Sequence, residues 1–317
     1  MGQKKKAVKM AIRGKPKKRN LDQGEIASLL KKIGFKSEEI IQEWRHLTAF
    51  GVYRGKEAVF KLASTQKTSK LTRNEYEWNA AVHAIHQTKH PNFTVPANYA
   101  SGIYNKLFYF ISQRFMGRPF IDRDSKNVSR IAPKIPIIAE VCHEIINLKI
   151  PKDSEYYKRQ SNPDYKVGEG VFNSASFWAS QTGIDLDGFL KAIEVRKDNI
   201  RAFPAHGDFS PRQLYNVDNL VGIIDGELSG LMGPLYLDPV WFYIRMRIDH
   251  KNGSLGREFL YEFIKKLKKE DQGTFWEEFK PVLCQKYIGE LWGAGKKVSR
   301  REDLKILGDE ILSNKII

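Results

Sequence analysis

Residues 206–227 read HGDFSPRQLYNVDNLVGIIDGE, and this stretch decides the fold. Its first acid, Asp208, lies in a loop bounded by glycine and proline, and a second acid, Asp225, follows two short β-prone runs. The dipeptide Asp218-Asn219 between these runs is typical of a two-residue hairpin turn. We therefore expect a β-hairpin that returns Asp225 toward Asp208.

Two neighbouring carboxylates are what phosphoryl transfer needs. One carboxylate orients or deprotonates an acceptor hydroxyl, and the other holds a metal ion on the phosphates. Gly207 permits the sharp turn that a bulkier residue would strain. A surface turn with two capping acids is the simpler structural alternative. Two acids that flank a hairpin in this pattern favour phosphoryl transfer.

The same block resembles the aminoglycoside phosphotransferase and choline kinase superfamily, whose members have a protein-kinase-like, two-lobed fold. Its hallmark is a His-Gly-Asp loop followed by a strand that ends in a hydrophobic residue, Asp, any residue and an acid. The resemblance implies that Asp208 is the catalytic base and Asp225 the main magnesium ligand, with Glu227 assisting at the metal or in the acceptor pocket. Asp238, followed by Pro239, would brace the catalytic loop.

A lysine upstream supports this interpretation. Lys61 ends the strand-like run Ala-Val-Phe-Lys, the context in which kinases place the lysine that binds the α- and β-phosphates. We expect Glu75, in a helix over residues 71–86, to pair with Lys61, and Glu77 on the opposite helix face is the alternative. Solvent-facing side chains at all three positions are the structural alternative. No G-x-G-x-x-G precedes Lys61, which counts more against a protein kinase than against this superfamily, whose nucleotide loop is degenerate.

Residues 113–119 are similar to the hinge that joins the two lobes in this superfamily. Backbone groups from Gln113 to Phe115 would then bind the adenine of ATP.

One position departs from the family pattern. Five residues after the catalytic Asp the family has Asn, which binds the second magnesium ion, whereas this chain has Gln213. Gln offers the same amide oxygen on a longer arm, so we expect Gln213 to serve as a metal ligand with altered geometry. Asn216 is the second choice. A weakened second metal site, reduced activity or a pseudokinase are the alternatives, and the retention of Lys61, Asp208 and Asp225 argues against the last.

The predicted fold class is α+β, with a small β-rich N-lobe followed by a larger, mainly helical C-lobe. We expect a basic, disordered tail over residues 1–20, a nucleotide-binding N-lobe over 21–115, and a C-lobe with the catalytic loop and acceptor pocket over 116–317. Within the N-lobe, the spacing of apolar residues predicts a helix over 21–46. Strands are predicted over 47–63, 96–104 and 107–115. In the C-lobe we expect a polar loop over 156–166 and helices elsewhere, apart from the hairpin.

The composition is that of an ordinary globular protein. Of the 317 residues, 41% are hydrophobic and 28% are charged. The chain has no apolar run of the length that a membrane span needs. Its two cysteines, Cys142 and Cys284, lie far apart, so we expect neither a disulfide scaffold nor a zinc site, and a cytoplasmic location fits best.

The net charge of +16 is concentrated at the N-terminus. Residues 1–20 hold seven Lys and two Arg without an acid, whereas the remaining 297 residues carry 44 basic and 37 acidic groups. A block of like charge is typical of a solubilising extension. Weak, salt-sensitive contact with nucleic acid or an anionic surface is the alternative.

These features predict an ATP- and Mg²⁺-dependent phosphotransferase that acts on a hydroxyl of a small molecule. The acceptor is left open among aminoglycosides, sugars, amino alcohols and other metabolites. A nucleotide-binding pseudokinase that acts as a scaffold or regulator is the alternative from another class. A protein kinase is disfavoured because residues 225–238 leave little room for an activation segment. The sequence does not indicate an oligomeric state.

Overall fold

The computed structural model describes residues 20–43, 45–86, 91–122, 125–295 and 298–316. The basic tail predicted over residues 1–20 therefore lies outside the described residues, apart from Asn20. Its predicted disorder and its contact with nucleic acid or an anionic surface stay predictions. Within the described ranges, no helix is both long enough and apolar enough to cross a bilayer.

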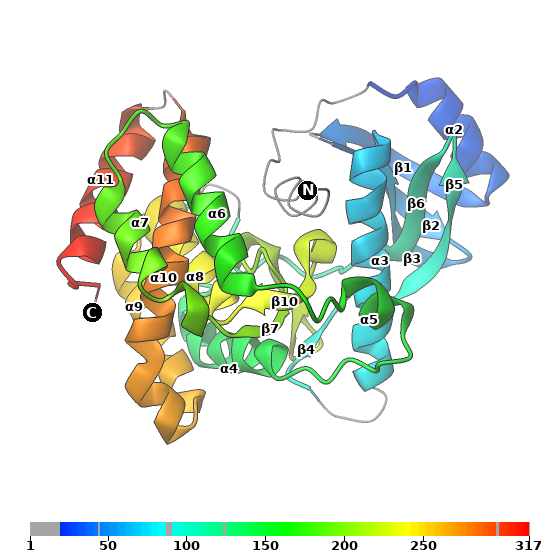
Figure 1. Cartoon of the computed structure of the whole chain (residues 1–317). Coiled ribbons are helices and arrows are strands. Elements are labelled where there is room, and N and C mark those ends of the chain that lie inside the picture. Colours follow the sequence, from blue (N-terminus) through cyan, green and yellow to red (C-terminus); the bar gives the residue numbers. More distant parts are fainter. Residues whose placement is uncertain (1–19, 44, 87–90, 123–124, 296–297, 317) are drawn as a thin grey trace.

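The N-lobe is built on an antiparallel sheet that, among the described residues, has five strands in the order β1-β2-β3-β6-β5 (Figure 1). The strands are β1 (Phe35–Glu43), β2 (His46–Tyr53), β3 (Lys56–Ala63), β5 (Asn98–Tyr104) and β6 (Leu107–Gln113). Helices α2 (Gln23–Lys32) and α3 (Gln66–His86) accompany the sheet. The β5–β6 turn is the predicted Asn105-Lys106, and both residues have positive φ, as a tight hairpin requires.

The two faces of β3 have different roles. Phe60 and Leu62 are fully buried in a core that they share with Ile26 and Leu30 of α2. Because successive side chains of a strand point to opposite faces, Lys61 is directed to the other face, which α3 covers. The strand thereby buries its apolar residues under α2 and presents its lysine toward α3.

The helix predicted over residues 21–46 is wrong in its second half. It ends at Lys32, Gly34 adopts a φ of +78°, and Phe35 begins the edge strand β1. A β-bulge between Ser37 and Glu39 breaks the alternation of the strand. The apolar residues after the bulge therefore fall at spacings that resemble a helix.

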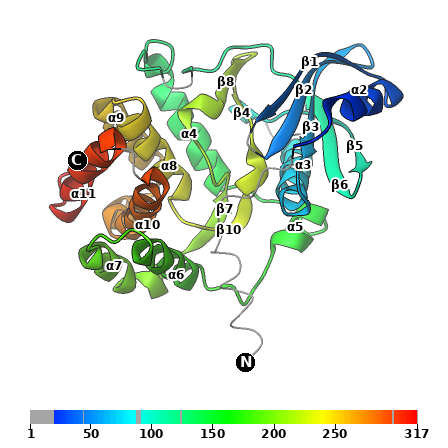
Figure 2. The same ribbon diagram turned by 90° about the horizontal axis from the view of Figure 1, so that it is seen from above.

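The C-lobe is mainly helical and carries two small sheets. Its helices are α4 (Ile135–Ile146), α5 (Glu155–Gln160), α6 (Val167–Ser180), α7 (Asp187–Glu194), α8 (Leu237–Ile244), α9 (Gly253–Lys266), α10 (Lys269–Ala294) and α11 (Val298–Leu312). Its strands are β8 (Leu214–Val217) and β9 (Leu220–Ile223), with β4 (Phe93–Thr94) parallel to β9, and β7 (Ala202–Ala205) paired with β10 (Gly230–Pro234). Seen from above, α9, α10 and α11 form the end of the molecule farthest from the N-lobe sheet (Figure 2).

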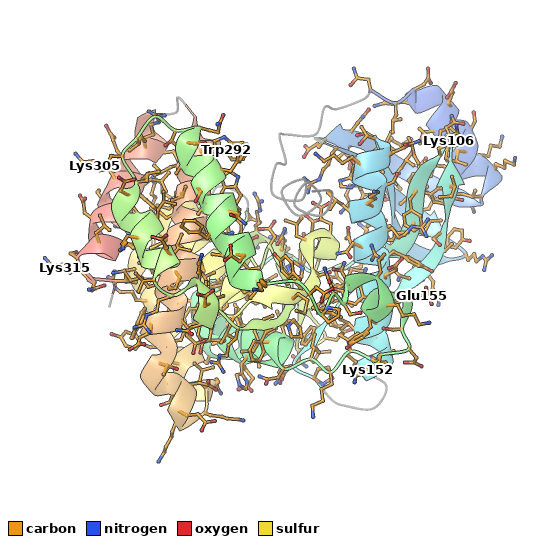
Figure 3. All side chains as sticks on the ribbon, in the orientation of Figure 1. Lys106, Lys152, Glu155, Trp292, Lys305 and Lys315 are labelled. Atoms are coloured by element: carbon orange, nitrogen blue, oxygen red, sulfur yellow. The ribbon has the colours of Figure 1, made fainter. Side chains whose placement is uncertain are left out.

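Aromatic packing fixes the long helices against each other. Trp292 of α10 stacks on Trp178 of α6, with ring centroids 6.1 Å apart, near one end of both helices (Figure 3). Phe275 and Phe279 stack within α10 at 4.9 Å and join the core of the C-lobe. These contacts join α6 and α10 in the core of the C-lobe.

The polar loop predicted over residues 156–166 is partly wrong, because residues 155–160 form α5. Ser154 caps the helix by accepting a hydrogen bond from the Tyr157 N–H, and Tyr156 is buried. The hydroxyl of Tyr156 donates to Ser229 Oγ at 3.1 Å. The polar composition hid a short helix that is anchored by one buried aromatic residue.

Candidate active site

The hairpin forms as the sequence predicts. Leu214 of β8 pairs with Ile223 of β9, and Asp218 and Asn219 make the turn with positive φ. Asp208 lies before the hairpin and Asp225 directly after it, so both acids reach the same end. The amide nitrogen of Gln213 lies 3.1 Å from Oδ2 of Asp208 and 3.3 Å from Oδ2 of Asp225. One side chain therefore links the two carboxylates.

Asp238 holds the loop that carries Asp208. Its two carboxylate oxygens accept hydrogen bonds from the backbone N–H groups of His206 at 2.7 Å and Gly207 at 2.9 Å. Gly207 has a φ of +83°, and a Cβ atom there would come within 2.3 Å of the Leu228 carbonyl oxygen. The loop therefore requires both the glycine and the buried acid.

Lys61 joins the N-lobe to the hairpin. Its ammonium nitrogen lies 2.6 Å from Oε2 of Glu75 and 2.7 Å from Oδ1 of Asp225. Glu77, the alternative partner, points elsewhere and accepts a hydrogen bond from Arg159 Nε at 2.7 Å. The structure thus brings Lys61, Glu75 and Asp225 into one cluster and leaves Glu77 outside it.

The charges of this cluster stabilise one another. Burial acts to raise the pKa of Asp225, but the Lys61 ammonium outweighs burial and holds that pKa well below its usual range. Burial acts to lower the pKa of Lys61, but Asp225 and Glu75 keep it above its ordinary value. Burial raises the pKa of Glu75, and Lys61 only partly offsets this effect. Asp225 and Lys61 are therefore both charged at neutral pH.

Asp208 has a different environment. Burial raises its pKa above the ordinary aspartate value, and the nearby Asp225 adds to the rise, whereas the Arg245 guanidinium opposes it. A raised pKa makes a carboxylate a better proton acceptor, which is the property that a general base needs. Burial lowers the pKa of His206, so its imidazole is neutral at pH 7.

Helix α3 is tied to the turn after Asp225 by a residue that the sequence did not single out. The amide nitrogen of Asn74 donates to the carbonyl oxygens of Ser229 at 2.8 Å and Glu227 at 3.2 Å. Gly226 lies against the Trp78 ring, where a Cβ atom would come within 2.4 Å. An Asn in a helix gives no sequence signal of such a role, because its partners are more than 150 positions away.

The β1–β2 turn also reaches the site. Arg45, between the two strands, forms an ion pair with Glu227, and His46 Nε2 lies 3.6 Å from the same carboxylate. His46 Nε2 also lies 3.0 Å from Thr72 Oγ1 of α3. Burial, with a smaller effect of Lys61, holds the pKa of His46 well below its usual value, so this ring is neutral. The β1–β2 turn thus carries a cation that contacts Glu227.

The predicted hinge residues differ in what they offer a base. The backbone N–H of Gln113 is used by the sheet, since it donates to the Ala97 carbonyl oxygen at 2.8 Å. Its side-chain oxygen accepts from the Ala97 N–H at 3.3 Å. For Phe115, no hydrogen bond of the backbone N–H is found within the described residues. Its ring lies 6.2 Å from that of Tyr215, against the hairpin. Phe115 therefore retains a free donor and an apolar wall, whereas the donor of Gln113 is occupied.

The oxygen atoms at this site suit a magnesium ion. Asp208, Asp225 and Gln213 are the oxygen ligands that Mg²⁺ prefers, and the side-chain oxygen of Gln213 is buried without a partner within the described residues. Both Asp225 oxygens are hydrogen-bonded, one to Lys61 and one to the Gln213 amide nitrogen. Rotation of the Gln213 amide would turn its unpaired oxygen toward the carboxylates. The residues therefore fit the ion, but its binding requires at least one of these hydrogen bonds to exchange.

Comparisons of sequence and of structure give different results. No protein-family profile and no curated protein sequence matches the chain. Among solved structures, the GDP and kanamycin complex of APH(2")-IIia is similar over 92% of this chain and 99% of that one, with 13% identity and a TM-score of 0.61. The chain has the aminoglycoside phosphotransferase fold.

A second enzyme with this fold is similar to the same extent. The ADP and hygromycin B complex of a thermostable APH(4)-Ia mutant matches over 90% of this chain and 97% of that one, with 12% identity and a TM-score of 0.62. An AMP-PNP and hygromycin B complex of another mutant of that protein has 13% identity and a TM-score of 0.63. The aminoglycoside phosphotransferase fold therefore extends over nearly the whole chain, including both lobes.

Proposed function

We propose that the chain is an ATP- and magnesium-dependent phosphotransferase that moves the γ-phosphoryl group of ATP to a hydroxyl of a small molecule. The observation that carries this proposal is the continuous series of contacts from Glu75 through Lys61 to Asp225, and from Asp225 through Gln213 to Asp208. This series joins a phosphate-binding type of lysine to a half-buried carboxylate with a raised pKa. Positioning and charge stabilisation are the main contributions of a protein to phosphoryl transfer.

The proposed nucleotide-binding residues lie in the N-lobe and the hinge. Lys61 would bind the α- and β-phosphates, and Glu75 would hold Lys61 in place. The backbone N–H of Phe115 would contact adenine, with Gln113 forming the adjoining strand end. The similar structures hold ADP, AMP-PNP or GDP according to their titles, which supports a nucleotide site in this fold.

The proposed chemistry is a single displacement. Asp208 accepts the proton of the acceptor hydroxyl while the acceptor oxygen forms a bond to the γ-phosphorus. The bond between the γ-phosphorus and its bridging oxygen breaks, and ADP leaves with that electron pair. Asp225 and Gln213 would hold magnesium, which supplies positive charge against the phosphate oxygens when it is bound. The ammonium group of Lys61 stabilises the negative charge of the phosphate oxygens from the N-lobe.

A pseudokinase that binds nucleotide without transferring phosphate is the second candidate function. It is favoured by one observation, the placement of a Gln213 amide nitrogen rather than an oxygen between the two carboxylates. If this arrangement persisted with nucleotide bound, the second metal position would be lost.

Two measurements test the proposal. Magnesium and ATP together should raise the unfolding temperature of the chain, because a ligand that binds the native state stabilises it. A coupled assay over a panel of hydroxyl acceptors should then show ADP release that Asp208→Asn lowers at least 100-fold. Asp164→Asn, an exposed loop residue, serves as the matched control. Stabilisation by nucleotide without stimulation by any acceptor would favour the pseudokinase, and the absence of both would refute both functions.

A further inference from the structure

A cationic cluster lies on helices α8 and α10 of the C-lobe, and α8 is the helix whose Asp238 holds the loop that carries Asp208. Lys286 of α10 places its ammonium nitrogen 4.9 Å from the ring centroid of Trp241 in α8, and the Arg245 guanidinium carbon lies 4.5 Å from the same centroid. Arg245 begins the π-helical turn Arg245–Asp249 that continues α8. Two cations thus share one indole ring, which binds them through its π face.

The acids around this cluster are already paired. Glu290 accepts from Arg245 at 2.9 Å and is also bound by Arg300. Asp249 accepts from Arg245 at 3.2 Å and from Arg300 at 2.7 Å. Two arginines and two carboxylates therefore neutralise each other in a closed network. The two acids are therefore occupied by the two arginines. Lys286 has no carboxylate within ion-pair distance among the described residues.

Other hydrogen-bond donors at the cluster also have no acceptor. Within the described residues, the indole N–H of Trp241 and the Nε–H of Arg245 are buried without a partner. Together with the ammonium group of Lys286, the indole N–H and the Arg245 Nε–H make three donors at this ring that have no acceptor within the described residues. Buried donors without partners are costly, so such a set indicates a ligand that supplies oxygen atoms with negative charge.

The cluster and the N-lobe cations reach the hairpin region from different lobes. The ammonium nitrogen of Lys61 lies 2.7 Å from Oδ1 of Asp225, and Arg45 forms an ion pair with Glu227, so the cations at this end come from the N-lobe. In the C-lobe, Asp238 of α8 accepts hydrogen bonds from the N–H groups of His206 and Gly207, and the ring of Phe242 in α8 lies 6.1 Å from that of Phe209, the residue after Asp208. The loop that carries Asp208 thus packs against α8, which carries Trp241 and leads into Arg245, whereas the N-lobe cations contact Asp225 and Glu227.

We propose that the phosphoryl acceptor carries an anionic group, a carboxylate or a phosphate, and that Lys286 binds this group with Trp241 and Arg245 so that the acceptor hydroxyl meets Asp208. The inference rests on the proposed function for the reaction itself, and it adds the class of substrate. A polycationic acceptor would place like charges against Lys286. The acceptors in the similar structures, kanamycin and hygromycin B, are aminoglycosides, so this chain is set apart from those enzymes by the sign of its acceptor site.

The deciding test measures an anion on a chain whose nucleotide site is filled. The full chain is first saturated with magnesium and AMP-PNP, and inorganic phosphate is then titrated by calorimetry. Lys286→Gln should weaken phosphate binding at least 10-fold without changing the affinity for AMP-PNP. Lys269→Gln removes the same charge from the exposed first residue of α10 and should leave both affinities unchanged.

Each other outcome overturns the inference. Equal phosphate affinity in Lys286→Gln and the unchanged chain would do so, as would the absence of saturable phosphate binding or tighter binding of kanamycin than of phosphate. Failure of the proposed function is seen separately, as a lack of AMP-PNP binding in the first step. The phosphate titration would then be made on Lys61→Ala, so that an anion bound at Lys61 does not hide the site at Lys286.

A set of sugars that differ in charge tests whether the site selects an anionic acceptor. Glucuronate, glucose and glucosamine share a ring and most hydroxyl groups but differ in charge, so they form a matched set for competition with phosphate. Glucuronate should displace phosphate from the saturated chain, and glucosamine should not. Displacement by glucosamine but not by glucuronate would contradict the inference.

Discussion

The ammonium nitrogen of Lys61 lies 2.7 Å from Oδ1 of Asp225, a residue 164 positions later in the chain. This bond joins the N-lobe sheet directly to the end of the C-lobe hairpin. The lysine thus places a positive charge against Asp225. Lys61, Asp225 and Gln213 are held together by direct contacts between the two lobes.

Loss of Lys61 should therefore affect both stability and activity. Lys61→Ala leaves Asp225 and Glu75 without their shared cation, and we expect the free energy of unfolding to fall by about 1–3 kcal/mol in urea titrations. Activity should fall at least 100-fold, because a charge aimed at the transferring phosphoryl group is lost. In a double-mutant cycle with Asp225→Asn, the two stability losses should be clearly less than additive. Additive losses would show that the bond contributes nothing.

Glu75 and Glu77 make a matched pair two residues apart on α3. Glu75→Gln should raise the KM for ATP and lower kcat, because Lys61 loses one of its two charged partners. Glu77→Gln removes only the ion pair with Arg159 and should keep steady-state kinetics within about twofold. Steady-state assays with ATP as the varied substrate check this expectation, and equal effects of the two substitutions would contradict the assignment.

Gln213 should control the requirement for magnesium. Gln213→Ala removes one proposed oxygen ligand and also the amide that links Asp208 to Asp225. We expect the magnesium concentration for half-maximal activity to rise at least fivefold, and Gln213→Asn to lie between alanine and the unchanged chain. An activity titration with magnesium at saturating ATP measures this. An unchanged magnesium requirement in Gln213→Ala would exclude Gln213 as a ligand.

Asp238 should matter for the loop rather than for the chemistry. Asp238→Asn replaces one of the two oxygens that accept the N–H groups of His206 and Gly207 with an NH₂ group. One buried backbone donor then lacks an acceptor, which costs about 1–3 kcal/mol of unfolding free energy. We expect kcat to fall while the affinity for ATP measured by calorimetry stays the same. A fall in ATP affinity with unchanged kcat would contradict this assignment.

Lys286 should reduce stability at neutral pH. Burial lowers its pKa to about 8, although Asp208, Glu290 and Asp238 raise it, and Arg245 acts in the same direction as burial. Because the unfolded chain holds this proton up to an ordinary lysine pKa near 10.4, the unfolding free energy contributed by Lys286 rises as the pH passes from about 8 to 10.4. Lys286→Met should therefore stabilise the chain at pH 7, by about 1–3 kcal/mol in urea titrations.

The affinity for an anionic acceptor should fall with rising pH, whereas the unfolding free energy rises. Phosphate binding to the nucleotide-saturated chain should weaken as the pH rises through about 8, since Lys286 loses its charge there. Calorimetric titrations at pH 7 and pH 9 measure this change, and Lys286→Gln provides the reference without the titrating group. A residue that destabilises the fold and tightens the ligand serves function at the expense of stability. If Lys286→Met destabilised the chain at pH 7, this account of Lys286 would be wrong.

Sequence reasoning predicted the parts of the site that depend on local pattern. The hairpin was predicted because Asp218-Asn219 is a strong turn signal between two β-prone runs. The two-lobed α+β fold followed from the motif at residues 206–227 and is confirmed by the structure and its similarity to aminoglycoside phosphotransferases. The edge strand β1 was missed because its bulge disguises the alternation of side chains.

The contacts that sequence reasoning did not find all join distant segments. Asn74, Arg45 and Lys286 have ordinary helix or turn contexts, and their roles depend on partners brought together by the fold. The pairing of Lys61 with Glu75 rather than Glu77 was likewise open, since α3 can present either face until its packing is known. Long-range register of this kind is set by the whole core and leaves no local trace.

Helix α3 contacts both lobes and so restricts their movement relative to each other. Through Trp78 and Val82 it shares the apolar core of the C-lobe, and through Asn74 it is bonded to the turn after Asp225. Tyr76 of the same helix packs edge-on against Phe110 of the N-lobe sheet. Part of the freedom of the two lobes relative to each other is therefore lost when the protein folds, so the proposed nucleotide site is preorganised. Removal of water from that site and ordering of the ligand remain as the principal costs of association.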